Sequence, residues 1–341
     1  RSSVQAFTRF ADNYYAVTNA IYSRAVTPVT GWAQVAVGSY DKAYRCRSIA
    51  ATSTALYAAI RDSSDSMVGV YSTTDGSTFT AMSATFGGTP AASMDVQALY
   101  AAGPAGSETL FAVARDSSSD YVLYYLNGGN FATTGISGSG WIPGVVYAGG
   151  NYWTTDYSAA SSTATVYYGS NTTWSSAKAI SDVVFTSIAA DTSSTPNRVF
   201  VGTKTGTVYA AATSAPATWN DGVQAWNSAD TAAVKALVYL PTSNELVAGR
   251  GMQDSYTSTF YGYYEIPLND SPSISFKTPL KGSDSSAVLK TNYSTTTQYL
   301  FVNGFYYDET AKRLFILENS SMKKLAALWS NTWDGTSLWG G

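Results

Sequence analysis

The stretch Arg47-Ser48-Ile49-Ala50-Ala51-Thr52-Ser53-Thr54-Ala55-Leu56-Tyr57-Ala58-Ala59 contains the pattern that decides the fold of this chain. It opens with a polar residue, a small residue and a bulky apolar residue. A second apolar run around Tyr57 follows after a few polar residues. Short apolar runs that are bounded by turn-forming residues are typical of neighbouring β-strands.

The opening triplet recurs along the whole chain, and its bulky positions are 42, 50, 46, 43, 49 and 68 residues apart. The seven copies are Gln5-Ala6-Phe7, Arg47-Ser48-Ile49, Gln97-Ala98-Leu99, Pro143-Gly144-Val145, Thr186-Ser187-Ile188, Lys235-Ala236-Leu237 and Asn303-Gly304-Phe305. A second apolar run follows each triplet, and a third run then ends on an aromatic residue. Most copies continue into a fourth run, which opens with Trp32, Phe79, Phe131, Trp174 or Trp219.

Four short strands in each repeat of about 45 residues predict the blade of a propeller. A lone four-stranded sheet with apolar residues on both faces cannot hide them from water, whereas a closed ring of sheets lets each face cover its neighbour. We therefore expect an all-β chain that forms one seven-bladed β-propeller, with four antiparallel strands in each blade. The expected blades span about 4–40, 46–90, 94–140, 142–182, 185–230, 234–285 and 300–341. Residues 281–297 form an insertion, and the first blade is expected to pack directly against the last.

Composition limits the function. Charged residues make up only 13% of the chain and the net charge is −3, which gives no electrostatic attraction for nucleic acid. No run of about 18 apolar residues exists, so no membrane span is expected. The start at Arg1 is consistent with a removed secretory or lipoprotein leader, or with a trimmed chain. Few lysines and many Ser, Thr and Tyr residues favour an extracytoplasmic location, with lipoprotein or surface-complex attachment as one form. The single cysteine, Cys46, is expected to be a buried apolar residue.

The segment Tyr71-Ser72-Thr73-Thr74-Asp75-Gly76-Ser77-Thr78-Phe79 resembles the Asp-box, or BNR, hairpin, whose pattern is Ser/Thr-x-Asp-x-Gly-x-Thr-Trp. It departs from that pattern because no residue separates Asp75 from Gly76. Residues 328–336 and 127–131 carry weaker copies. The resemblance implies a propeller of the Asp-box type with its boxes on the rim opposite the ligand face. Sialidases of this family carry a Phe/Tyr-Arg-Ile-Pro segment, which is absent here, so sialidase activity is not expected.

Histidine is absent, which excludes Ser-His-Asp sites, Cys-His sites and His-ligated metals. We expect no catalytic residue, no cofactor and no metal site. The absence of histidine does not exclude catalysis by carboxylates, so a glycoside hydrolase or lyase that uses two carboxylates remains an alternative.

Polar and charged residues recur where a second strand of a repeat is expected to turn into the third, and at the starts of the expected innermost strands. Together they predict a mixed-charge ring at one mouth of the channel. The ligand-binding candidates are Arg47, Arg61, Asp62, Arg115, Asp116, Asp156, Lys204, Lys235, Arg250 and Glu318. The competing interpretation is turn chemistry, in which Asp and Ser cap amides and Arg pairs locally.

Three functions are compatible with this pattern. The favoured hypothesis is a non-catalytic binding or scaffold propeller that recognises protein or glycan through the channel-mouth face. The alternatives are the carboxylate-dependent hydrolase or lyase, and a structural subunit of a surface assembly, which would expose an apolar patch. A fold shared by all three cannot select among them.

Overall fold

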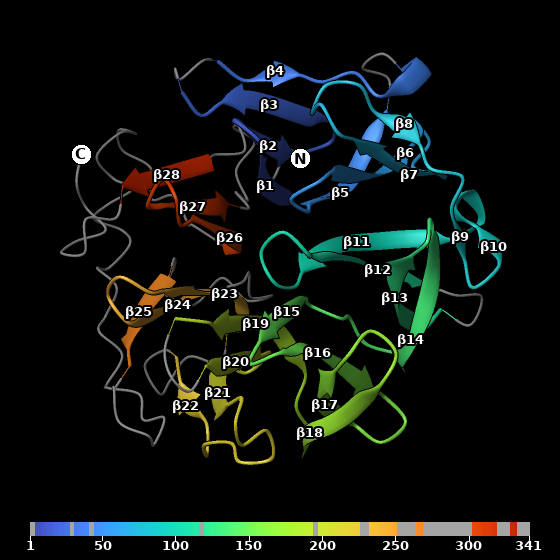
Figure 1. Ribbon diagram of the computed structural model, residues 1–341. Coiled ribbons are helices and arrows are strands. Elements are labelled where there is room, and N and C mark those ends of the chain that lie inside the picture. Colours follow the sequence, from blue (N-terminus) through green and yellow to red (C-terminus); the bar gives the residue numbers. More distant parts are fainter. Residues whose placement is uncertain are drawn as a thin grey trace.

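The computed structural model describes residues 4–27, 31–40, 44–115, 119–193, 197–225, 232–250, 263–268, 302–318 and 328–332. Within these ranges the strands form separate sheets, antiparallel apart from one short parallel pairing, that are arranged around a central axis (Figure 1). The chain is all-β here, apart from the three-residue 3₁₀ turns η1 (Gly38–Tyr40) and η2 (Ala91–Ser93). None of the helices in this part of the chain is long and apolar enough to cross a membrane.

The first four sheets come from the N-terminal part of the chain. The first contains β1 (Ala6–Phe10), β2 (Asn13–Val17), β3 (Ile21–Ala25) and β4 (Ala33–Gln34), and the second β5 (Arg45–Ala51), β6 (Leu56–Arg61), β7 (Met67–Thr73) and β8 (Thr80–Ala81). The third contains β11 (Asp95–Ala102), β12 (Thr109–Arg115), β13 (Tyr121–Asn127) and β14 (Asn130–Gly138), with β9 (Thr85–Phe86) and β10 (Thr89–Pro90) added beyond β14. The fourth contains β15 (Val145–Ala148), β16 (Asn151–Ser158), β17 (Thr163–Gly169) and β18 (Trp174–Ser181).

The remaining sheets continue the ring. One contains β19 (Phe185–Asp191), β20 (Arg198–Thr203), β21 (Thr207–Ala212) and β22 (Val223–Gln224). The next contains β23 (Val234–Leu240), β24 (Glu245–Arg250) and β25 (Tyr263–Pro267), and the last β26 (Val302–Asp308), β27 (Arg313–Glu318) and β28 (Leu328–Thr332). Three expected features lie outside the described residues: the fourth strands of these last two sheets, the insertion 281–297, and residues 333–336 of the weaker Asp-box copy at 328–336.

The innermost strand of each sheet contains one of the triplets found in the sequence. In β1 and β15 the first residues of the triplet precede the strand. Side chains alternate between the two faces of a strand, so neighbouring triplet positions serve different interfaces. In β11, Leu99 packs toward the second sheet and Ala98 toward the fourth. Each neighbouring pair of sheets thus encloses its own apolar cluster, and the hydrophobic effect that holds the ring together is distributed around it.

One segment pairs with a different sheet from the one expected. Residues 85–90 belong to the expected blade 46–90, but β9 bonds in parallel to β14 of the third sheet, with Phe86 opposite Phe131. The two rings stack with centroids 4.3 Å apart, and both side chains are buried. The link between the second and third sheets therefore covers the outer edge of the third.

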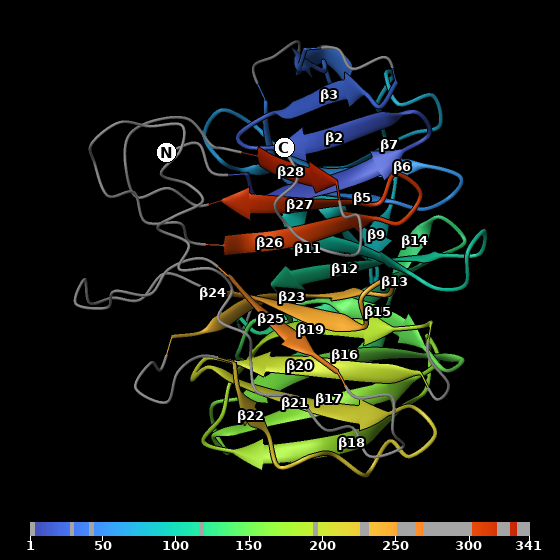
Figure 2. The same cartoon turned by 90° about the vertical axis from the view of Figure 1, so that its left-hand side faces the viewer.

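The first and last sheets lie side by side, as Figures 1 and 2 show from two directions. Phe7 and Tyr14 of the first sheet pack with Phe315 of the last, and the Phe7 and Phe315 ring centroids are 4.5 Å apart. Arg9 forms an ion pair of 2.9 Å with Asp308, and the Tyr14 hydroxyl donates a 2.8 Å hydrogen bond to the same carboxylate. The ring is thus closed by side-chain contacts between β1–β2 and β26–β27.

Candidate functional site

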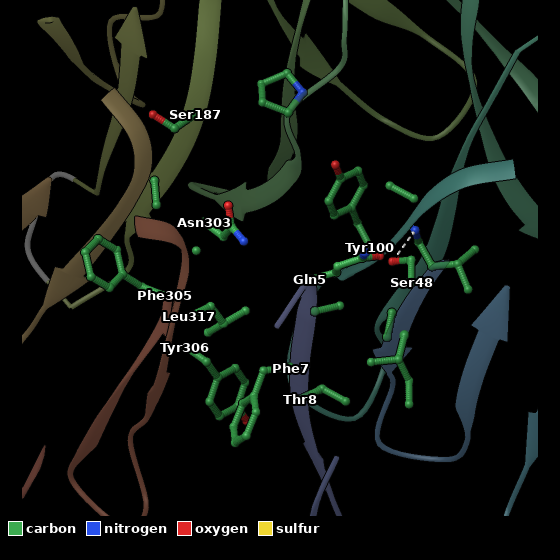
Figure 3. Close-up of a pocket in the computed structure, with 18 of the residues that line it drawn as sticks. Gln5, Phe7, Thr8, Ser48, Tyr100, Ser187, Asn303, Phe305, Tyr306 and Leu317 are labelled. Atoms are coloured by element: carbon green, nitrogen blue, oxygen red, sulfur yellow. Dashed lines mark hydrogen bonds between the residues drawn. The ribbon is translucent and has the colours of Figure 1, made fainter. Parts of the chain in front are cut away.

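A cavity of about 970 Å³ occupies the centre of the ring. Its walls come from the innermost strands of all the sheets, β1, β5, β11, β15, β19, β23 and β26, and from the residues directly before them. Figure 3 shows Gln5, Ser187 and Asn303 around this space, together with the apolar side chains of Phe305 and Leu317. The cavity is therefore the channel of the ring, and each sheet contributes the same strand to it.

Five of the innermost strands contain a β-bulge at the same position. The pairing register with the second strand of each sheet skips one residue, and in every case that residue is the polar first member of a triplet: Arg47, Gln97, Thr186, Lys235 and Asn303. A bulge leaves its extra residue out of the ladder and redirects its side chain. All five residues line the channel cavity. We call these five residues the bulge ring.

Gln5 occupies the corresponding place in the first sheet, directly before β1. Its backbone N–H donates a 2.8 Å bond to Val17, the same residue that lies opposite Ala6 in the ladder. The fourth sheet differs, because Pro143 lines the cavity at this level and β15 begins only at Val145. A proline has no N–H to give to a ladder, so this strand starts later.

Two cations of the bulge ring have no anionic partner within the described part of the chain. The ion pairs found there involve Arg9, Arg61 and Arg198, and neither Arg47 nor Lys235 takes part in one. Arg47 also has a buried Nε atom without a hydrogen-bond acceptor. Desolvation by the channel walls lowers the pKa of Lys235, although its side chain still reaches water in the channel.

The described residues that line the cavity include no Asp or Glu. Arg9 also lines it, but its charge is matched by Asp308. Among the described lining residues, the charges of Arg47 and Lys235 are therefore not matched by an acid, even though the whole chain has a net charge of −3. In a narrow, partly desolvated space such charges act on a ligand more strongly than they would on an open surface.

Beyond the bulge ring, each innermost strand continues with the small residue of its triplet and then with the bulky one. The Ser48 hydroxyl accepts a 3.1 Å bond from the Leu99 N–H, and the Ser187 hydroxyl donates a 2.6 Å bond to the Val234 carbonyl. Each of these bonds joins two adjacent innermost strands, and Figure 3 shows the first as a dashed line. The bulky members of the triplets line the cavity, but apart from Phe305 they are buried in the clusters between sheets: Phe7, Ile49, Leu99, Val145, Ile188, Leu237 and Phe305.

Arg61, the last residue of β6, and Asp62, in the turn that follows, do not line the channel cavity. Arg61 is buried and donates to the Asp65 carbonyl at 2.9 Å and to the Val96 carbonyl at 3.2 Å, and it forms an ion pair with Asp95. Asp62 accepts bonds of 2.8 and 2.9 Å from the N–H groups of Ser64 and Ser66. Asp62 thus stabilises its own turn, and Arg61 joins the second sheet to the third.

Four further candidates lie at strand ends. Arg115 donates a 3.3 Å bond to the Ser119 carbonyl, and its guanidinium lies 5.2 Å from the centre of the Tyr121 ring. Lys204 is exposed on the turn after β20, and Arg250 is buried at the end of β24. These three do not line the channel cavity. The backbone of Glu318 pairs with Val302 at the end of β27. Asp116 and the Glu318 side chain lie outside the described residues.

Asp156 lies within β16 and not at the turn where the sequence analysis places it. Its side chain is buried and accepts a 3.3 Å bond from the Tyr167 hydroxyl. Burial raises the pKa of Asp156 to about 6, against the smaller opposing effects of hydrogen bonds from Tyr167 and Thr165. Tyr167 packs in the cluster between the third and fourth sheets, so this carboxyl group belongs to an interface and not to the channel.

The hairpin between β7 and β8 carries the segment that resembles an Asp-box. The Asp75 carboxylate accepts bonds from the Thr78 and Ser77 N–H groups at 2.7 and 2.8 Å and from the Thr73 hydroxyl at 2.7 Å, and these bonds lower its pKa. Gly76 has a φ of +75°, and Phe79 is buried. The Asp75 carboxylate therefore stabilises its own turn, which is a structural role.

A second cavity of about 410 Å³ lies at the turns that follow the innermost strands, and the sequence analysis did not predict it. Its lining residues include Ser53, Glu108, Asp308 and Glu309. Glu108 accepts 3.0 and 2.9 Å bonds from the N–H groups of Ser53 and Gly106, and these bonds outweigh burial and lower its pKa to about 2. Glu108 therefore holds turns together, and Asp308 pairs with Arg9 across the closure of the ring. No cluster of potential metal ligands occurs in the part of the chain that the structure describes.

Comparison with solved structures identifies the class of the protein. The extracellular domain of the one-component system BT4673 from B. thetaiotaomicron matches 93% of this chain with a TM-score of 0.59 at 14% identity, and the match spans 37% of that chain. YCF48 bound to D1 peptide matches 94% of this chain and 91% of its own, with a TM-score of 0.59 at 12% identity. Sqt1 from Saccharomyces cerevisiae matches 92% of this chain and 80% of its own, with a TM-score of 0.54 at 12% identity.

These neighbours are β-propellers, and the chain described here has the β-propeller fold. The chain spans little more than a third of the length of the BT4673 extracellular domain. No protein-family model and no curated protein matches the chain in sequence. At these levels of identity the likeness defines the fold alone.

Proposed function

We propose that this chain is a non-catalytic binding propeller that holds a protein or glycan at the channel mouth formed by the bulge ring. The observation that carries the proposal is the repeated bulge, which turns one polar side chain from each of five sheets into a single cavity. Each bulge interrupts the backbone pairing between two strands. Because this interruption recurs at the same position in five sheets, it favours a role in recognition. A concave site with convergent polar groups is also the usual form of a ligand site.

The proposal includes a ring of seven blades of the Asp-box type. The blade count is supported by the sheets of the described residues and by the apolar cluster between each neighbouring pair. The Asp-box assignment is supported by the bonds of Asp75, the positive φ of Gly76 and the buried Phe79. An extracytoplasmic location is supported by the composition of the chain and by the extracellular neighbour BT4673.

A hydrolase that uses two carboxylates is less well supported. It requires two carboxyl groups that face one groove, with one pKa raised. The pKa of Asp156 is raised, but its side chain lies between sheets, and the described lining of the channel contains no carboxylate. The two cations Arg47 and Lys235 in the described lining favour binding over this chemistry.

The proposal is tested by filling the channel mouth with large side chains. Replacing Gln5 and Gln97 by Trp adds bulk to two partly or fully exposed positions of the channel without touching an apolar cluster. We expect the immobilised native protein to retain one or more ligands from a glycan array or from the extracellular proteins of the source organism, and the filled variant to lose them. Glu309→Trp, at the opposite cavity, is the matched control and should behave as the native protein does. Equal retention by all three proteins would contradict a channel-mouth site.

A further inference from the structure

The bulge ring has a chemistry that selects among ligands. It carries two cations, Arg47 and Lys235, from the second and sixth sheets of the ring. Gln5 and Gln97 supply side-chain amides, which donate hydrogen bonds readily to carboxylates. The Thr186 hydroxyl donates to the Val234 carbonyl at 2.7 Å, and the Asn303 amide donates to the Val4 carbonyl at 3.3 Å. Within the described residues no acid lines the cavity to compensate the two charges.

The two cations are separated along the wall of the channel. Going around the ring from β23 to β5, the strands β26 and β1 lie between them. One small carboxylate can therefore approach one of the two charges, whereas a chain with several carboxylates can approach both. Multiple contacts of this kind raise the affinity by making the second contact intramolecular.

The apolar wall of the channel adds a second requirement. Phe305 lies two residues beyond Asn303 on β26, and Val146 follows the triplet of the fourth sheet. Both line the cavity and are only partly buried, whereas Ile49 and Leu237 are packed between sheets. A ligand that reaches both layers presents acidic groups at the mouth and apolar groups below. A peptide with acidic and aliphatic side chains has this combination, whereas an acidic glycan lacks the aliphatic part.

We propose that the ligand of the bulge ring is an acidic peptide segment that contains aliphatic residues, with its carboxylates held by Arg47 and Lys235. This inference rests on the proposed function, because it names the ligand class of the same channel mouth. Charge pairs in a partly desolvated site contribute to both specificity and association rate. Binding is therefore expected to weaken as the salt concentration rises.

The experiment is a selection of random 12-residue peptides, displayed on phage, against the immobilised native protein. We expect the selected peptides to be enriched in Asp and Glu together with Leu, Ile or Val. Fluorescence anisotropy with the labelled peptides should show at least a tenfold loss of affinity for Arg47→Ala and for Lys235→Ala. Gln97→Glu, which is almost isosteric but adds a negative charge, should cause a similar loss. Lys204→Ala removes an exposed cation outside the channel and should change the affinity less than twofold.

Other outcomes overturn the proposal in distinguishable ways. Selected peptides without an excess of acids, or acidic peptides that bind the Arg47→Ala and Lys235→Ala variants as well as the native protein, would reject the peptide chemistry. So would a selection that yields no binder. If polygalacturonate binds in an Arg47-dependent way and no peptide does, the ligand is an acidic glycan and the channel-mouth function stands. If ligands bind the Gln5→Trp, Gln97→Trp double variant unchanged, the channel-mouth function itself fails.

Discussion

At the scale of single residues, Asp156 shows how burial between sheets changes the charge state of an acid. The pKa of Asp156 is about 6 in the folded protein, above the ordinary value of 3.8. The folded state then binds this proton more tightly than the unfolded state does, so stability falls as the pH rises from about 4 to about 6. We expect Asp156→Asn to lack this decline and to be more stable at pH 7.5, by at most about 3 kcal/mol. Thermal unfolding at pH 4.5 and pH 7.5 measures both effects.

Tyr167→Phe is the partner experiment for Asp156. The Tyr167 hydroxyl donates to the carboxylate at 3.3 Å and thereby favours its charged form. Its removal should raise the pKa of Asp156 further and make the loss of stability with rising pH larger. An Asp156→Asn protein with the same pH dependence as the native protein would reject this account.

At the scale of the element, the β7–β8 hairpin depends on a glycine for two reasons. Gly76 has a φ of +75°, and a Cβ atom at this position would lie 2.1 Å from the Tyr15 hydroxyl oxygen. Tyr15 is buried and donates a 2.9 Å bond to the Gly76 carbonyl, which joins the first and second sheets. Backbone strain alone costs about 1–3 kcal/mol. We therefore expect Gly76→Ala to lower stability by more than 2 kcal/mol, measured by chemical denaturation.

The two costs at Gly76 can be separated. Adding Tyr15→Phe to Gly76→Ala removes the atom that clashes but leaves the backbone strain, so the double variant should regain part of the loss. Gly31 is an exposed loop glycine without a positive φ, and no atom lies within 4 Å of the position that a Cβ would take. Gly31→Ala should be nearly neutral, and an equal effect at Gly31 and Gly76 would contradict the argument.

The sequence predicts strands better than it predicts side-chain partners. Triplets such as Gln97-Ala98-Leu99 locate the innermost strands, because the layers around a channel repeat in every sheet. A single segment does not predict the bulges, because a register shift depends on both of the paired strands. Arg61 illustrates why side-chain partners are harder to predict. The sequence suggests a partner in its own turn, whereas its ion-pair partner Asp95 is 34 residues away in the next sheet.

At the scale of the whole molecule, the circle of sheets is joined where the first meets the last. The Asp308 carboxylate is buried there and accepts bonds from Arg9 at 2.9 and 3.1 Å, from Tyr14 at 2.8 Å and from the Ala311 N–H at 2.9 Å. Burial alone would raise the pKa of Asp308, but these bonds outweigh it and lower the pKa. The pair therefore stabilises the ring at neutral pH, and its contribution is lost as the pH falls below the ordinary value of 3.8.

Breaking this pair should open the ring at its closure before the other interfaces. We expect Arg9→Met to cost about 2–3 kcal/mol, because Asp308 keeps two neutral donors but loses its cation. Asp308→Asn in the same protein should recover part of that loss, since no buried charge then remains unmatched. Hydrogen exchange should show earlier opening of β1 and β26 in Arg9→Met, while β12 and β20 keep native protection. Uniformly faster exchange in all the sheets would mean that the ring loses stability as one unit and that the closure between β1–β2 and β26–β27 is no weaker than the other interfaces.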